Sequence, residues 1–212
     1  MALVLDCAAH GTRAVSFGGG EPLEYPPLFE VLAATRGHLF RSITTSGLRL
    51  DAALDALVAA APEKVHVSIH DPGVAAEVAG AVRQVRVLEA RGIRGGVNLL
   101  VRRSGIAAAR AAGAELRAAG IDAGRIVWLP LRRDADVPSP EDVAAVAGGP
   151  FQSATCLAGC APSPRFASLD ADGRAAHCSY TRSRAPLQAM THAALLEALA
   201  AAPLVPCGGS PP

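Results

Sequence analysis

The sequence predicts an α/β fold built on a parallel sheet, and two features of the chain carry this prediction. Five short apolar runs rich in β-prone residues alternate with segments whose apolar residues recur at helical spacing. The strand-like runs end in glycine or polar residues before the next helix-like segment begins. Strands and helices that alternate in this way form βαβ units, whose right-handed crossovers allow either a doubly wound sheet or a barrel.

Length and composition restrict the function classes. The 212 residues are 50% hydrophobic, enough for one sizeable core or one main domain with an appendage. A net charge of +1 provides no basic field, so we expect no nucleic-acid partner. No apolar run reaches the ~18 residues that span a bilayer, and the first residues lack signal-peptide features, so we expect no membrane association and a cytoplasmic location. In a reducing compartment, five cysteines favour metal or redox chemistry over disulfides.

Each predicted element has a local justification. Glycines 11, 37, 92 and 120 each follow a helix-like segment and are expected to stop it, and Asp51 is expected to cap the helix that it begins. The predicted strands are residues 14–17, 39–45, 65–69, 96–102 and 125–131. The predicted helices are residues 3–10, 26–36, 51–61, 74–91, 106–119, 141–147 and 191–201.

The chain changes character near residues 132–140, a polar stretch that contains proline. We therefore divide it into residues 1–135, the α/β part, and residues 136–212, a cysteine-rich extension. Two β-prone runs in the extension, residues 165–169 and 174–177, are joined by the sequence DADG, in which Asp172 and Gly173 predict a hairpin turn.

The stretch with the clearest chemical content is residues 14–23, AVSFGGGEPL. A short strand ends at Gly18, Gly19 and Gly20, and these are followed by Glu21 and Pro22. Glycines leave backbone groups open to a ligand, and proline stiffens the exit of the loop. A tight strand-to-helix turn is the alternative interpretation.

The GGEP sequence resembles the methionine-binding motif of the radical S-adenosylmethionine (radical SAM) superfamily. This resemblance, over residues 12–131, implies a partial (β/α) TIM-like barrel that lacks its N-terminal part. It also implies that the glycine loop hydrogen-bonds the amino group of the cofactor S-adenosylmethionine (AdoMet). The residues implied in cofactor binding are Gly18, Gly19, Gly20, Glu21, Pro22, Thr45, Ser46, Ser68, Asp71, Asn98 and Arg102. Turn formation, helix capping or surface charge are the alternatives for the residues after Pro22.

The chain departs from the family pattern in one respect. The catalytic [4Fe-4S] cluster of this superfamily is bound by a Cys-x3-Cys-x2-Cys loop upstream of the glycine loop, but the only cysteine before position 156 is Cys7. Either the chain is truncated or mis-started, or it has lost the chemistry. The helix-like residues 3–10 favour truncation as our expectation, and whether this chain is itself an enzyme stays open.

The cysteine-rich end contains a second pattern. Cys160, Gly173 and Cys178 have a spacing similar to that of the SPASM and twitch extensions, which hold auxiliary iron-sulfur clusters in this superfamily. The implied metal ligands are Cys156, Cys160, Cys178 and Cys207, with an auxiliary [4Fe-4S] cluster as the expected group and zinc as its rival. Unligated buried cysteines are the third possibility.

The resemblance implies hydrogen abstraction by a 5′-deoxyadenosyl radical from a peptide or small-molecule substrate, with a reductant protein as a further partner. An inactive barrel that binds a nucleoside or peptide ligand, with a structural zinc or iron-sulfur site, is the alternative. A zinc-stabilised scaffold without a cofactor is the third hypothesis.

Overall fold

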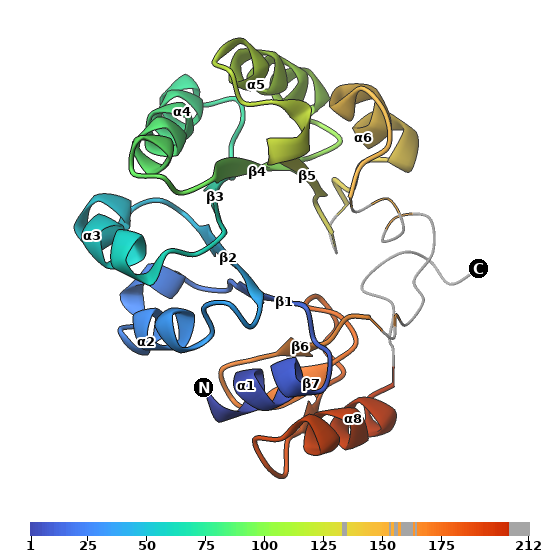
Figure 1. The fold of residues 1–212 in the computed structure, drawn as a ribbon. Helices are drawn as coiled ribbons and strands as arrows, with labels where there is room; N and C mark the ends of the chain where they lie inside the picture. Colours follow the sequence, from blue (N-terminus) through green and yellow to red (C-terminus); the bar gives the residue numbers. More distant parts are fainter. Residues whose placement is uncertain (133–134, 153, 155–156, 158–162, 164, 204–212) are drawn as a thin grey trace.

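The centre of the structure is a curled parallel sheet of five strands in the order β1-β2-β3-β4-β5. The computed structural model describes residues 1–203 except 133–134, 153, 155–156, 158–162 and 164. The strands are β1 (Ala14–Phe17), β2 (Phe40–Thr45), β3 (Lys64–Ile69), β4 (Gly95–Val101) and β5 (Ile126–Pro130). Figure 1 shows the strands as an arc with the helices along its outer side, which confirms the predicted partial barrel.

The spatial order of the strands follows the chain without a reversal, which is the arrangement of a barrel and not of a doubly wound sheet, and one helix lies in each crossover. The crossover helices are α2 (Pro27–Ala34), α3 (Leu50–Ala60), α4 (Ala75–Ala90) and α5 (Ile106–Ala118). Helix α1 (Ala2–Ala9) precedes the sheet and α6 (Pro140–Ala147) follows it, while the short 3-10 turns are η1 (Pro22–Glu24) and η2 (Ala123–Arg125). None of the helices in the described part of the chain has the length and apolarity needed to cross a bilayer.

The two faces of the sheet differ in chemistry. Ile43, Val65 and Val97 lie in the hydrophobic core under the helices, and each is 1% exposed or less. Because side chains alternate along a strand, the residues next to them in sequence face the concave side. Thr44 and Asn98 are on that side, so the interior of the half-barrel is lined with polar groups.

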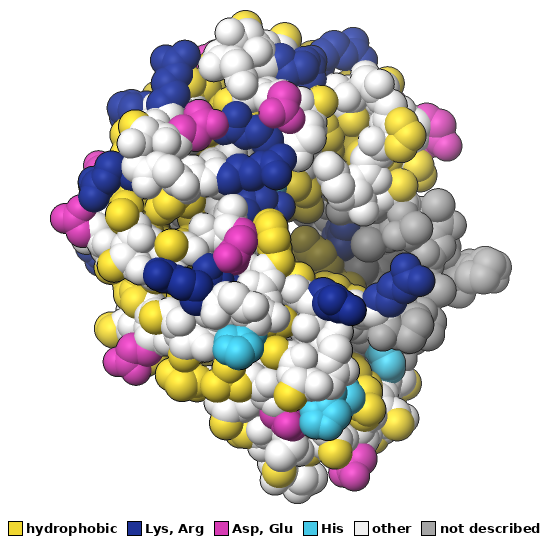
Figure 2. Space-filling model, viewed as in Figure 1, with side chains coloured by type: hydrophobic (Ala, Val, Ile, Leu, Met, Phe, Trp, Pro, Cys, Tyr) yellow, Lys and Arg dark blue, Asp and Glu magenta, His cyan; other side chains and the backbone are white. Residues whose placement is uncertain are grey.

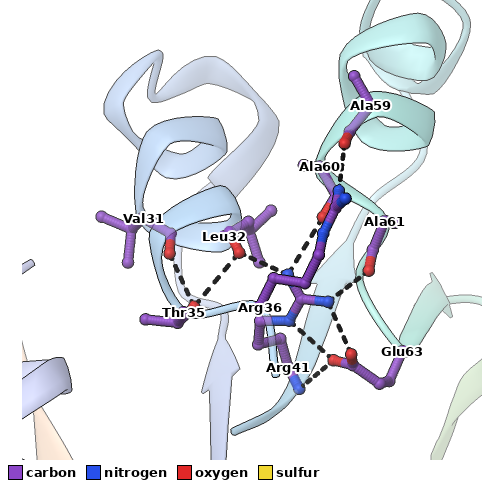
Figure 3. A network of polar contacts seen from close by, with 9 residues as sticks. All are labelled: Val31, Leu32, Thr35, Arg36, Arg41, Ala59, Ala60, Ala61 and Glu63. Carbon is purple, nitrogen blue, oxygen red and sulfur yellow. Dashed lines mark hydrogen bonds and ion pairs between the residues drawn. The ribbon is translucent and has the colours of Figure 1, made fainter. Parts of the chain in front are cut away.

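Arg41 links β2 to the ends of two helices (Figure 3). Its side chain is buried and donates to the carbonyls of Leu32, Ala60 and Ala61, at the carboxyl ends of α2 and α3. It also pairs with Glu63 through Nε at 2.9 Å and Nη2 at 2.6 Å. The guanidinium therefore satisfies helix carbonyls that have no partner within their own helix.

The C-terminal extension forms a small antiparallel sheet and a helix. Its elements are β6 (Ser168–Leu169), β7 (Arg174–Ala176), β8 (Ala185–Pro186) and α8 (His192–Ala201). Helix α8 lies beside α1 (Figure 1), where the rings of His10 and His192 stack with centroids 4.7 Å apart. The carboxylate of Asp6 also accepts a hydrogen bond from the backbone N–H of His192 at 2.6 Å.

The predicted elements are present, with ends that differ by a few residues. The hairpin with Gly173 at its turn joins β6 to β7, as predicted, whereas β8 was not predicted. The prediction that Asp51 caps its helix was wrong, because α3 begins at Leu50 and Asp51 lies in its first turn.

Candidate functional site

The glycine loop follows β1 at the carboxyl edge of the sheet, where parallel α/β folds place their ligands. Gly19 and Gly20 have positive φ angles of +81° and +52°, a conformation that side chains with a Cβ rarely adopt. A Cβ at either position would meet no atom within 4 Å, so their backbone faces open space. A Cβ on Gly18 would lie 3.8 Å from Cβ of Thr44, which places Gly18 against the concave face.

The side chain of Glu21 connects the glycine loop to the end of β2. Its Oε1 accepts from Thr45 Oγ1 at 2.7 Å and from Leu23 N at 3.1 Å. Its Oε2 accepts from Ser46 N at 2.9 Å and from Ser46 Oγ at 2.5 Å. Burial by itself would raise the pKa of the Glu21 carboxyl, but the hydrogen bonds from Ser46 and Thr45 outweigh burial and lower that pKa. Glu21 is therefore a carboxylate at neutral pH.

The loop has two further supports. Pro22 and Leu23 are buried at the start of η1, which anchors the exit of the loop in the core. Glu24 and Arg49 form an ion pair at 2.9 Å between the loops that follow β1 and β2. Since both of these side chains are more than half exposed, the ion pair contributes little compared with the buried anchor.

The end of β2 holds the glycine loop through side chains that were predicted to contact the cofactor. Thr45 is 1% exposed, and its Oγ1 accepts from Gly47 N at 3.0 Å in addition to donating to Glu21. Gly47 has φ +83°, and Gln84 Nε2 donates to its carbonyl at 2.9 Å. Thr45 and Ser46 therefore fix the geometry of the loop, and direct contact of either with a cofactor stays a prediction.

A polar layer inside the half-barrel joins three strands. Asn98 Nδ2 on β4 donates to Thr44 Oγ1 on β2 at 3.2 Å, and Asn98 Oδ1 lies 2.8 Å from His66 Nδ1 on β3. Since the amide oxygen is an acceptor, His66 Nδ1 carries the proton and Nε2 is left as an acceptor. Ser68 is paired with Asn98 in the register of β3 and β4 and lies on the same face.

His66 was not among the predicted site residues. It is 4% exposed, and its Nε2 has no hydrogen-bond partner in the described part of the chain. Burial lowers the pKa of His66 to about 4, so the imidazole is neutral at pH 7. The signal that could have found it is its position two residues before Ser68, on the same face of the strand.

Two predicted residues lie at the rim and not in the polar layer. Asp71 follows β3, is exposed, and accepts from Gly73 N at 3.0 Å. Arg102 follows β4 and is also exposed. Both belong to the carboxyl edge of the sheet, as does the glycine loop, but no described contact joins either of them to that loop. Their role in cofactor binding stays a prediction.

The cysteine set is only partly visible. Cys178 is a half-buried free thiol, and its Sγ accepts from Tyr180 N at 3.3 Å. Cys156, Cys160 and Cys207 lie outside the described residues. Among the residues that the structure describes, no group of three or more His, Cys, Asp or Glu side chains could hold a metal ion.

Cys7 and Trp128 are core residues. Cys7 is buried in α1, and burial together with the negative charge of Asp6 raises the pKa of its thiol. Trp128 is 3% exposed and packs against Gly113 of α5, where there is no room for a Cβ. Core packing therefore accounts for the position of Trp128.

Comparison with known proteins supports the fold assignment. No protein-family model matches the sequence. The GTP 3',8-cyclase of Chlorobaculum tepidum is 41% identical over 70 residues, which are 32% of this chain and 21% of that protein. The match therefore spans about a fifth of the length of this curated relative.

Solved structures match over most of the chain. A structure of anSMEcpe with bound AdoMet has a TM-score of 0.62 at 15% identity and covers 92% of this chain and 67% of its own. A structure of anSMEcpe with bound AdoMet and the Kp18Cys peptide has a TM-score of 0.61 at 14% identity and covers 93% and 70%. The fold of this chain is thus the α/β half-barrel of these two structures. This likeness confirms the partial barrel that the resemblance of the glycine loop to the radical SAM superfamily implied.

Proposed function

We propose that this chain is a radical SAM-type protein that binds AdoMet at the carboxyl edge of the half-barrel. The observation that carries this proposal is the glycine loop: Gly19 and Gly20 present bare backbone to open space, and Glu21 ties the loop to the end of β2 through three hydrogen bonds. An ammonium group needs acceptors that stay aimed at it, and a backbone loop held by an ionised carboxylate provides them.

The other proposed cofactor contacts extend across the sheet from that loop. Gly18, Gly19 and Gly20 would hold the amino group of the methionine. Ser68 on β3 and Asn98 on β4 face the concave side and would bind the ribose and the carboxylate of AdoMet. Asp71 and Arg102 would contribute from the rim. The amide of Asn98 is already engaged with Thr44 and His66, so we propose that it contacts the cofactor only after exchanging one of these partners.

The residues of this chain do not fit the catalytic cluster. The 212 residues contain no Cys-x3-Cys-x2-Cys run, and Cys7 is buried in α1. A [4Fe-4S] cluster supplies the electron that cleaves AdoMet when it is bound. For these residues alone we therefore propose AdoMet binding, and hydrogen abstraction from a peptide or small molecule only where such a cluster and a reductant protein are supplied.

For the C-terminal extension we propose a metal site at Cys156, Cys160, Cys178 and Cys207. An auxiliary [4Fe-4S] cluster is our first assignment and zinc is the second. Metal analysis of protein purified without air separates them: iron and sulfide with a brown chromophore supports the cluster, one zinc per chain supports the second assignment, and a metal-free protein contradicts both.

Calorimetric titration with AdoMet tests the proposal. We expect one site per chain, and no measurable heat at ~1 mM AdoMet would contradict it. The alternative function, a barrel that binds its ligand without chemistry, also predicts AdoMet binding. Production of 5′-deoxyadenosine under dithionite, after reconstitution with iron and sulfide, would exclude that alternative.

A further inference from the structure

Arg132 follows β5, the edge strand at the opposite end of the sheet from β1 and its glycine loop. Strand β5 ends at Pro130, and Leu131 N still donates to Val101 O at 2.8 Å, so Arg132 directly follows the last paired residue of the sheet. All five strands are parallel, and the carboxyl end of β5 therefore belongs to the same edge as the loop after β1. Arg132 is a rim residue of the proposed cofactor site, on the opposite side of the opening.

The guanidinium of Arg132 is held in place but lacks acceptors. Its Cζ lies 4.0 Å from the centroid of the Tyr180 ring, a cation-π contact. Its Nε and Nη1 atoms are buried, and neither has a hydrogen-bond partner among the residues that the structure describes. These two atoms carry three N–H donors, and a buried donor without an acceptor is unfavourable. A ligand that brings an acceptor would remove this penalty, once the atoms that cover the guanidinium have moved aside to admit it.

The part of the C-terminal extension that the structure describes after residue 164 contacts both free edges of the half-barrel. Tyr180 stacks on Arg132 after the last strand, and His192 is bonded to Asp6 in the helix that precedes the first strand. The extension therefore reaches across the open side of the arc. Figure 2 shows the molecule hollowed in its middle, with Lys and Arg side chains near the margin of the hollow.

We propose that Arg132 binds a carboxylate of a peptide substrate, with Tyr180 keeping the guanidinium in the orientation that receives it. A carboxylate supplies two acceptor oxygens to a planar, permanently charged donor, and charge-assisted hydrogen bonds of this kind are strong. A peptide is favoured as the source because anSMEcpe, which shares the fold, has been solved with bound peptides. The inference rests on the proposed function, since it places the substrate across the opening from AdoMet.

The test follows Arg132 itself by NMR. Protein labelled with 15N-arginine is titrated with Ac-Gly-Glu-Gly-NH2 and with Ac-Gly-Gln-Gly-NH2, and the Nε–H signal of Arg132 is assigned by its absence in Arg132→Lys. We expect a saturable shift with the glutamate peptide and at least fivefold weaker binding of the glutamine peptide. Tyr180→Leu should weaken binding of the glutamate peptide about three- to tenfold. Arg117→Met, which replaces an exposed arginine on α5, should leave that affinity unchanged.

Other outcomes overturn the inference. Equal responses to the two peptides would mean that the carboxylate is not recognised, and an equal response to inorganic phosphate would mean a general anion site. A shift caused by AdoMet alone would assign Arg132 to the cofactor carboxylate. If AdoMet binds in calorimetry but the glutamate peptide leaves Arg132 unmoved, this inference falls and the proposed function stands. If the peptide binds and AdoMet does not, the proposed function falls and the carboxylate site remains.

Discussion

Replacing Glu21 with glutamine tests whether the carboxylate holds the glycine loop. Glu21→Gln keeps the size of the side chain, but one of its two terminal atoms becomes an NH2 donor. In either orientation that NH2 group faces two of the four groups that now donate to Glu21, at Leu23 and Thr45 or at the N–H and Oγ of Ser46. The backbone N–H of that pair loses its acceptor, whereas the hydroxyl can turn and accept from the NH2 group. One hydrogen bond is therefore lost, and the other three become neutral ones.

The expected size of the effect follows from these contacts. Hydrogen bonds to a charged group contribute ~1.5–3 kcal/mol each and neutral ones ~1, so the ordered loop should lose about 2 kcal/mol after allowance for partial exposure. That corresponds to a decrease of up to ~30-fold in AdoMet affinity. Calorimetry with AdoMet measures it, and Glu24→Gln, which removes the carboxylate of an exposed ion pair, is the matched control. If the AdoMet affinity of Glu21→Gln lay within twofold of that of the unmodified protein, the claim that this carboxylate holds the glycine loop would be refuted.

Three further predictions concern single residues. Gly20→Ala should lower the free energy of unfolding by ~1–2 kcal/mol and weaken AdoMet binding at least tenfold. Gly11→Ala, also at a positive φ (+91°), should affect stability alone, and equal AdoMet affinity in both variants would contradict this. Arg41→Met should lower the free energy of unfolding in urea by ~3–5 kcal/mol because it leaves buried helix carbonyls unpaired, and a loss below ~1 would contradict the network of Figure 3. His66 takes up a proton near pH 6.5 when unfolded but only at about 4 when folded, so its contribution to stability is complete above pH 6.5 and falls as the pH drops toward 4, by ~3 kcal/mol in all. His66→Gln should flatten the pH dependence of the free energy of unfolding in urea over this window, whereas His38→Gln, at an exposed site, should not. An unchanged pH profile in His66→Gln would refute the claim that buried His66 is neutral.

The fold and the position of the glycine loop could be predicted because their signals are local. Alternating strand and helix patterns identified all five strands of the sheet, and three glycines after the first strand marked the open loop. The choice between a barrel and a doubly wound sheet needed the resemblance, since it depends on the side to which each crossover turns, and periodicity does not record that.

The interactions that hold the site could not be predicted in the same way. Glu21 is bonded to residues at the end of the next strand, more than 20 positions away, and Asn98 to His66, 32 positions away. Tyr180 reaches Arg132 from the extension. Such partners follow from the register of the strands and from how the extension packs, and single residues in a sequence do not encode either one locally.

The central claim, that the loop after β1 holds the methionine of AdoMet, is tested most directly by NMR of protein labelled with 15N-glycine. On addition of AdoMet, we expect the amide signals of Gly19 and Gly20 to shift in a saturable manner, while Gly173 in the hairpin of the extension stays in place. Saturable AdoMet binding that leaves Gly19 and Gly20 unmoved, or no binding at all, would contradict the claim.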